Sequence, residues 1–130
     1  MRAVYTIGTR GKPLSTFINQ LRVAGVDAVI DKDLASALLA EEVGVDIFVM
    51  ATDVPGVMLD FGKPGEKLLR RLTIGDARGY LKNGQFGTGS MQPKIEAAVR
   101  LFERTAKRAL ITSTSGIEAG IAGTAGTQFV

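Results

Sequence analysis

Two lysines and two aspartates in this sequence have the chemistry needed to hold a phosphoryl group. Lys32 and Asp33 follow one apolar segment directly, and Asp53 follows another. Lys94 comes after a turn containing Gly89, in the predicted first turn of a helix. Because a helix N-terminus carries partial positive charge, a lysine there is unfavourable by up to about 1 kcal/mol. The position of Lys94 therefore favours a strongly negative neighbour, such as a phosphate.

The turn before Lys94 has the composition of an anion-binding loop. Gly87, Gly89 and Ser90 are small or flexible, so their backbone N–H groups can approach a ligand closely. The helix expected to begin near Pro93 would direct its positive end to the same place. The turn does not match the Walker A motif, in which serine or threonine follows Gly-Lys. Taken alone, it indicates a phosphate site without defining the class of protein.

Polar residues also follow three predicted strands, at 31–33, 52–53 and 112–115. Because α/β proteins bind ligands beyond the carboxyl ends of their strands, we expect these clusters and the 89–94 turn to share one rim. Carboxylates there can orient lysines or hydroxyls, or contribute to a Mg²⁺ site.

Each of these polar residues also has a purely structural interpretation, which the sequence leaves open. Asp33 suits the N-cap of the helix that follows it. Thr52 and Asp53 suit the opening of a turn. Lys32 suits an exposed surface position, and the hydroxyls at 112–115 suit a loop or a cap.

The elements that position these residues alternate between strands and helices. Continuous apolar runs predict buried strands, whereas apolar residues three or four positions apart predict helices. Strands are predicted at 3–7, 26–30, 45–51, 57–59 and 108–114, with a final edge strand at 127–130, and helices at 15–25, 34–43, 73–84 and 95–102, with a short helix or loop at 116–123. This order favours an α/β fold around a largely parallel sheet.

The 34–43 helix allows a more detailed prediction. Leu34, Leu38 and Leu39 form one stripe that we expect to face the core. Asp33 is predicted to be its N-cap, and Gly44 is predicted to end it.

Composition limits the chemistry that these elements can carry. The chain has 130 residues, enough for one compact domain, and no apolar run long enough to cross a bilayer. It lacks cysteine and histidine, which excludes disulfides, thiolate or histidine metal sites and Ser–His or Cys–His nucleophiles. No signal peptide is recognised, and a cytoplasmic location is expected. The net charge of +3 is spread along the chain and aromatic residues are few, so neither a nucleic-acid nor a membrane partner is predicted.

Several longer motifs resemble one known family. These are "AVIDKDLASALLAEEVGVDIFVMATDV", "DFGKP" (Asp60–Pro64), "GTGSMQPKIEAAVRLFE" and "KRALITS". Together, in this order, they are similar to the C-terminal half of carbamate kinases, members of the amino acid kinase family. The resemblance runs from about residue 26 to residue 130. Residues 1–25 show only two glycines where the family has a glycine-rich stretch, so we expect a divergent segment there.

The resemblance implies an αβα sandwich whose C-terminal lobe binds ATP or ADP with Mg²⁺. Family members transfer a phosphoryl group reversibly between ADP and carbamoyl phosphate, a step of arginine metabolism. By motif, Lys32 corresponds to a lysine that stabilises the transferred group, and Asp33 to the aspartate that organises the catalytic lysines. Lys94 corresponds to a lysine on the nucleotide phosphates. Thr52, Asp53 and Val54, together with the Gly89–Ser90 turn, correspond to the nucleotide site.

The relatives are more than twice as long, and their N-terminal lobe carries the carbamate end of the site. We therefore expect a nucleotide-binding lobe that needs such a lobe, which a separate chain can supply. A non-catalytic remnant of the same fold and a family member with another acceptor remain alternatives. Because half of such a fold exposes a strand edge and an apolar flank, we also expect a homo-oligomer, most simply a dimer.

Overall fold

The computed structural model describes residues 32–87 and 89–130. The chain divides into two compact units, Met1–Lys32 and Asp33–Val130, and the second unit contains the fold set out below. The strands expected at 3–7 and 26–30 and the helix expected at 15–25 lie outside the described residues.

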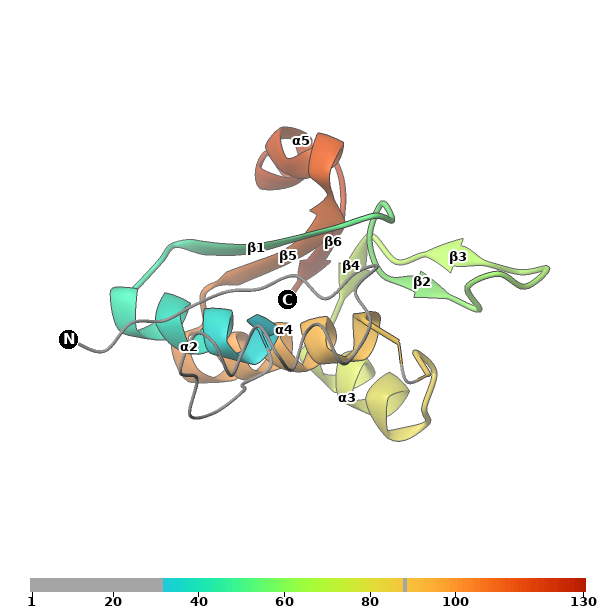
Figure 1. Ribbon diagram of the computed structural model, residues 1–130, viewed down its shortest axis with the longest axis horizontal. Helices are drawn as coiled ribbons and strands as arrows, with labels where there is room; N and C mark the ends of the chain where they lie inside the picture. Colours follow the sequence, from blue (N-terminus) through green and yellow to red (C-terminus); the bar gives the residue numbers. More distant parts are fainter. Residues whose placement is uncertain (1–31, 88) are drawn as a thin grey trace, which may run out of the picture. The chain divides into compact units, whose positions relative to one another are not determined.

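The centre of the second unit is a four-stranded sheet in the order β1-β5-β6-β4 (Figure 1). These strands are β1 (Ile47–Thr52), β5 (Arg108–Ser113), β6 (Thr127–Phe129) and β4 (Arg71–Leu72). Strands β1 and β5 pair in parallel, as do β4 and β6, whereas β5 and β6 are antiparallel. The predicted α/β fold with a mostly parallel sheet is confirmed.

The prediction of an edge strand at the C-terminus is wrong. Strand β6 lies inside the described sheet, between β5 and β4. Its Thr127 is completely buried and its Phe129 is 2% exposed. A three-residue strand can occupy an interior position here because both neighbouring strands supply hydrogen-bonding partners, and this pairing cannot be read from a short C-terminal segment.

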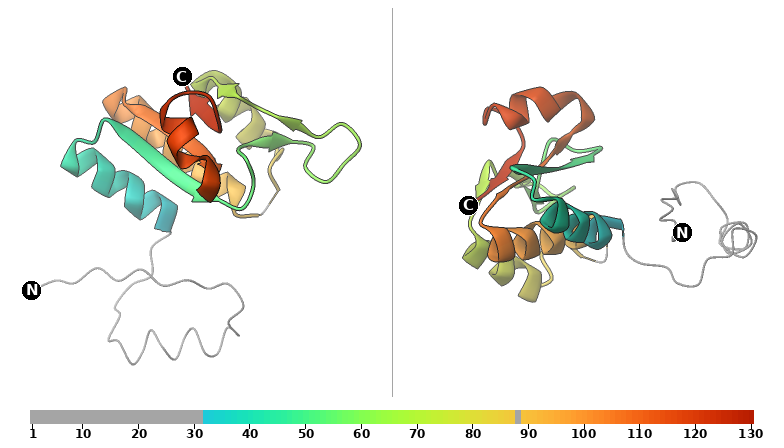
Figure 2. Two further views of the ribbon diagram at one scale, coloured as in Figure 1. Left: turned by 90° about the horizontal axis from the view of Figure 1, so that it is seen from above. Right: turned by 90° about the vertical axis from the view of Figure 1, so that its left-hand side faces the viewer.

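Helices cover both faces of this sheet (Figures 1 and 2). Helices α2 (Lys32–Val43), α3 (Ile74–Lys82) and α4 (Met91–Thr105) lie on one face. Helix α5 (Ile117–Ile121), preceded by the 3-10 turn η1 (Thr114–Gly116), lies on the other. The described residues thus form the three layers of the predicted αβα sandwich.

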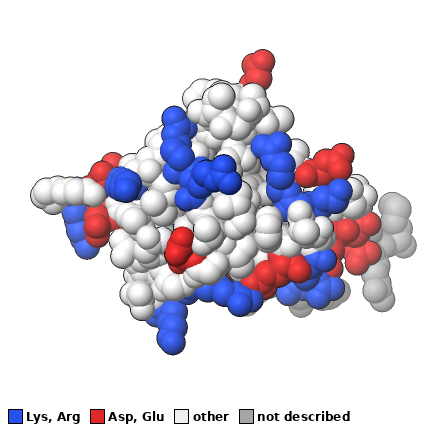
Figure 3. Space-filling view, turned by 180° about the vertical axis from the view of Figure 1, so that it is seen from behind, with Lys and Arg blue, Asp and Glu red and all other residues white. Residues whose placement is uncertain are grey.

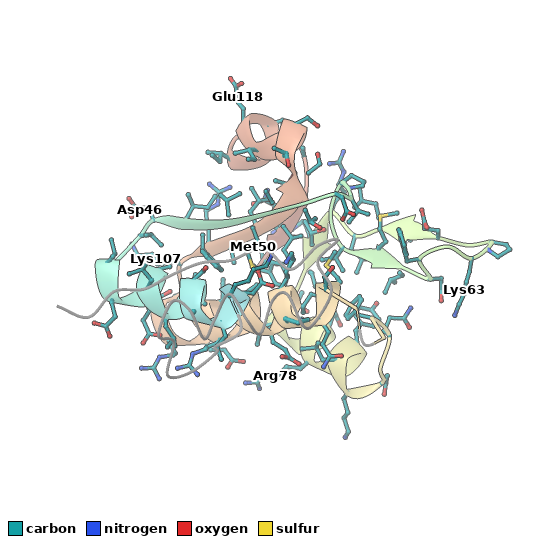
Figure 4. The ribbon with its side chains drawn as sticks, viewed as in Figure 1. Asp46, Met50, Lys63, Arg78, Lys107 and Glu118 are labelled. Carbon is teal, nitrogen blue, oxygen red and sulfur yellow. The ribbon has the colours of Figure 1, made fainter. Side chains whose placement is uncertain are left out.

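Helix α4 provides most of the helical contribution to the core. The apolar residues that predicted this helix were Ile95, Ala98, Val99 and Phe102. The first three are buried, Phe102 is half-buried, and Leu101 is buried as well. Met50 of β1 is buried between the sheet and this helix layer (Figure 4). The start of α3 is also as predicted, since the Thr73 hydroxyl accepts a hydrogen bond from the Asp76 N–H at 3.0 Å.

The predicted inward face of α2 is wrong. Leu34 and Leu38 are each 37% exposed and Leu39 is 65% exposed, whereas Ala37 and Ala40 face the core. Two alanines face the core here because an ion pair near each end of α2 fixes the rotation of the helix about its own axis. The carboxylates of Asp33 and Glu41 pair with Lys94 and Arg104 of α4.

The two ends of α2 differ in how well the sequence predicted them. Asp33 lies inside the first turn and is not the N-cap, because the helix already begins at Lys32. Gly44 ends the helix as predicted, with φ of +74°. Its N–H donates to the Glu41 carbonyl at 3.2 Å, and the Val45 N–H donates to the Ala40 carbonyl at 3.2 Å, which is the Schellman pattern.

A small second sheet stands apart from the first. Strands β2 (Met58–Leu59) and β3 (Lys67–Leu68) form an antiparallel hairpin that projects away from the main sheet in both Figures 1 and 2. We call residues 58–68 the arm. The short strand predicted at 57–59 is present as β2.

We predict that Gly126→Ala destabilises the fold much more than Gly123→Ala. Both glycines have positive φ, which costs an alanine about 1–2 kcal/mol. A Cβ on Gly126 would also lie 2.6 Å from Leu110 Cδ1 and 2.8 Å from the Ile111 carbonyl oxygen, whereas one on Gly123 meets nothing within 4 Å. Overpacking of this kind adds about 1–3 kcal/mol. Urea unfolding measures both changes, and equal losses would contradict the packing described at Gly126.

Candidate functional site

A pocket of about 430 Å³ lies where β1 ends and α4 begins. Its volume falls in the range of small-molecule sites, about 300–1,000 Å³. Three segments line it: the end of β1, the first half of the arm, and the turn from α3 to α4. The lining residues are 52–54, Met58, 60–61, Lys63, 85–87 and 89–91.

The end of β1 contributes Thr52, Asp53 and Val54 to the pocket, and all three were candidates from the sequence. The Thr52 hydroxyl donates to the Asp53 carboxylate at 3.1 Å. Thr52 is paired in register with Ser113 of β5, so two of the predicted polar clusters do lie side by side at one rim. The 112–115 cluster does not line the pocket, and within it Ser113 and Ser115 place their hydroxyl oxygens 3.4 Å apart.

The turn into α4 contributes Gly87, Gly89 and Ser90. Gly87 has φ of +59°, a conformation that glycine adopts without strain. Among the described residues, no side chain caps the first turn of α4, and that turn contains no acidic residue. Backbone N–H groups and the positive helix end therefore face the pocket rim, an arrangement that suits an anion.

Lys94 has a negative neighbour within the protein itself. Its Nζ donates to the two carboxylate oxygens of Asp33 at 2.9 Å and 3.2 Å. The Lys94 side chain is 7% exposed and that of Asp33 is 12% exposed. Lys94 does not line the pocket but lies one helical turn beyond Ser90, which does. The two residues that the motif linked, an organising aspartate and a lysine, are thus in direct contact.

Lys32 begins α2 and is exposed. It belongs to the unit Met1–Lys32, whereas Asp33 and Lys94 belong to the unit Asp33–Val130. The expectation that Lys32 joins Lys94 at a common phosphate site therefore stays a prediction.

Sequence reasoning missed the part of the pocket wall that the arm and the 85–86 segment provide. Asp60, Phe61 and Lys63 belong to the "DFGKP" motif, which carried only the family resemblance. Gln85 and Phe86 precede the glycine turn directly, so closeness to the turn was the signal that could have found them.

No cluster of three or more acidic side chains suited to a metal ion exists within residues 32–87 and 89–130. Two carboxylates, Asp53 and Asp60, line the pocket. The helices in these ranges are all too short or too polar to cross a membrane. The face in Figure 3 carries both basic and acidic side chains.

The fold and the pocket define an α/β protein whose candidate site lies at the carboxyl end of a parallel strand, beside a helix start. The sequence profile of the amino acid kinase family matches residues 14–113, and the chain belongs to this family.

Carbamate kinases are homologues of the chain. It is 44% identical over 109 residues to that of Thermoplasma volcanium and 44% identical over 127 residues to that of Thermococcus kodakarensis. These alignments cover 84% and 98% of this chain but only 36% and 40% of those proteins. The solved structure of carbamate kinase from Giardia lamblia bound to AMP-PNP superposes with a TM-score of 0.76 at 38% identity, covering 81% of this chain and 37% of that one.

We predict that Lys94→Met lowers the free energy of unfolding by about 3–5 kcal/mol, because it leaves the Asp33 charge buried without its lysine. Lys107→Met is the matched control. Lys107 pairs with Asp46 (Figure 4) at 3.2 Å. The two side chains are 47% and 96% exposed, so the loss should stay within about 1 kcal/mol.

Chemical denaturation of both variants measures the difference. The double variant Asp33→Asn, Lys94→Met should lose less than Lys94→Met alone, because the buried charge that paired with Lys94 is then removed as well. Equal stability of the Lys94 and Lys107 variants would show that the buried Lys94–Asp33 pair contributes no more to the free energy of unfolding than the exposed Lys107–Asp46 pair.

Proposed function

We propose that this chain provides the nucleotide-binding lobe of a carbamate-kinase-type phosphotransferase. The observation that carries the proposal is the pocket between the end of β1 and the start of α4. Five of the six residues predicted to bind nucleotide line it: Thr52, Asp53, Val54, Gly89 and Ser90. The substrates would be ATP or ADP on this side, and carbamate or carbamoyl phosphate on the other.

The residues at the turn fit a polyphosphate. The N–H groups of the Gly89–Ser90 turn and of the first turn of α4 have the geometry and charge to hold phosphate oxygens. A side chain at Gly89 would have room, since its Cβ would approach only the Phe86 carbonyl oxygen, at 4.0 Å. The open space at this glycine is therefore available to a ligand.

The two pocket carboxylates suit Mg²⁺ bound together with a nucleotide. Magnesium in such sites takes one or two protein carboxylates and fills its remaining positions with phosphate oxygens and water. Asp53, at the end of β1, and Asp60, on the arm, are the candidates. The ion would neutralise charge on the phosphates, which is the chemistry that phosphoryl transfer requires.

We assign the catalytic roles to Lys32, Asp33 and Lys94. In the direction of ATP synthesis, an oxygen of the ADP β-phosphate attacks the phosphorus of carbamoyl phosphate. The bond from phosphorus to the carbamate oxygen breaks, and carbamate leaves with that electron pair. Lysine ammonium groups stabilise the negative charge on the transferred group. Because Asp33 holds the Lys94 ammonium by two hydrogen bonds, we assign Asp33 the role of a positioning residue.

The acceptor end of the reaction needs groups outside the described residues. The chain spans about two fifths or less of the curated relatives that it matches, so a second lobe has to provide the carbamate end. A coupled assay for ATP formation from carbamoyl phosphate and ADP distinguishes this from a non-catalytic remnant. Robust turnover by this chain, alone or with a complementing lobe, would exclude the alternative that the chain is a non-catalytic remnant of the fold.

We also propose that the chain self-associates in the cytoplasm. Leu39 and Val43 of α2 are 65% and 68% exposed, and β1 is an outer strand of the described sheet. Apolar surface and a strand edge that has no partner among residues 32–87 and 89–130 both favour association with another copy. Light scattering should then report a dimer, and a strict monomer at high concentration would contradict this.

We predict that Gly89→Glu weakens Mg·ADP binding by at least about ten-fold, equivalent to 1.4 kcal/mol, because a carboxylate at the turn repels the phosphates. Gly79→Glu is the matched control. A Cβ at Gly79 meets nothing within 4 Å, and Gly79 lies on α3 outside the pocket lining. Isothermal titration calorimetry measures both variants. Equal affinity of the two variants for Mg·ADP would show that the phosphates do not bind at the turn.

A further inference from the structure

Two of the three methionines within residues 32–87 and 89–130 line the candidate pocket, and we call Met58 and Met91 the pocket methionines. Both are half-buried. The third, Met50, is 5% exposed and lies between the sheet and the helix layer (Figure 4). The chain contains no cysteine, so its thioethers are its only sulfur groups. An oxidant that enters the pocket therefore meets sulfur at two places.

Met91 is the first residue of α4 and lies at the turn that we propose for the phosphates. Its side chain lines the pocket and also packs against the hydrophobic core. Among the described residues, no side chain caps this helix start, and its first turn carries no acidic group. An oxygen added to the Met91 sulfur would place a new hydrogen-bond acceptor beside the N–H groups that we assign to the phosphates.

Met58 lies on a different segment of the pocket, at the base of the arm. It pairs with Leu68 across the hairpin formed by β2 and β3. The residue before it, Val57, is completely buried, and its N–H donates to the Thr127 hydroxyl oxygen at 2.8 Å. The backbone at Met58 is therefore anchored to the interior of the unit, which keeps its thioether at the pocket wall.

Oxidation of a thioether needs only a peroxide. The sulfur lone pair attacks one oxygen of hydrogen peroxide, and the O–O bond breaks. The other oxygen leaves as hydroxide and takes the proton from the oxygen now bound to sulfur, so the products are a sulfoxide and water. Sulfur loses two electrons and the peroxide gains them. The side chain becomes polar where it was apolar, and a sulfoxide reductase restores the thioether.

We propose that Met58 and Met91 are modification sites, and that their oxidation by peroxide lowers the affinity of the pocket for its nucleotide. This inference rests on the proposed function, because it takes the ligand to be a nucleotide. A sulfoxide oxygen at the pocket wall loses its hydration when a ligand covers it, which weakens binding. The lobe thus releases nucleotide under oxidising conditions and binds it again after reduction.

Peptide mapping by mass spectrometry locates the oxidation in the full chain treated with hydrogen peroxide. One oxygen atom should be added at Met58 and Met91 several times faster than at Met50, because Met50 is buried. Bound Mg·ADP should slow oxidation of both pocket methionines, since it covers them, and should leave the rate at Met50 unchanged. Equal rates at all three residues in the ligand-free chain would overturn the assignment.

Titration calorimetry measures the effect on binding. Peroxide treatment should weaken Mg·ADP binding to the unsubstituted chain by about ten-fold, equivalent to 1.4 kcal/mol. Each variant is compared with itself before and after treatment. The affinity of the double variant Met58→Leu, Met91→Leu should not respond to peroxide, because leucine has no sulfur. Met50→Leu is the matched control and should lose affinity on treatment as the unsubstituted chain does.

The outcomes separate the two proposals. If peroxide oxidises the pocket methionines without changing the affinity for Mg·ADP, the regulatory role is overturned and the nucleotide site stands. If treatment weakens binding to the double variant as much as to the unsubstituted chain, the effect arises elsewhere and the role is also overturned. If the untreated chain does not bind Mg·ADP, the proposed function and the effect on affinity both fail, whereas the mapping still decides whether Met58 and Met91 are the oxidised residues.

Discussion

The path of the chain from α4 into β5 is the constraint on which the candidate site depends. Helix α4 ends at Thr105 and β5 begins at Arg108, so only a two-residue reversal joins them, with Ala106 at φ of +53°. Helix and strand therefore run in opposite directions, which brings the first turn of α4 to the carboxyl end of β5. Because β1 pairs in parallel with β5, the same constraint places Thr52 and Asp53 beside that helix start.

The ion pairs at the two ends of α4 differ in how deeply they are buried. At the end where α4 finishes, both members of the Lys107–Asp46 ion pair are exposed, so that pair contributes little to stability. At the end where α4 starts, Lys94 and Asp33 are both nearly buried. A buried pair is weak support for stability, since apolar residues of similar size often do as well. Its position one turn from the pocket supports the catalytic role that we propose for the pair.

The sequence was most informative where one local rule determines the outcome. The apolar run of β1, the Thr73 cap and the glycine at position 44 were all predicted, because each depends on a few neighbouring residues. The inward face of α2 was not, because ion pairs from α4 fix the rotation of that helix. The interior position of β6 was also missed, since it depends on pairing with β4, which lies far earlier in the sequence. The wall formed by the arm was missed because its contact with the opposite wall joins Asp60 to Gln85, 25 residues away.

We propose that the rim formed by β1 and α4 holds nucleotide phosphates, and amide chemical shifts measured during titration with Mg·ADP test this role. The largest shifts should occur at Thr52, Asp53, Gly89 and Ser90, and the amide resonances of α5, on the other face of the sheet, should not move. Saturable binding with its largest shifts on α5 or at the far end of β5, and none at the turn before α4, would contradict it.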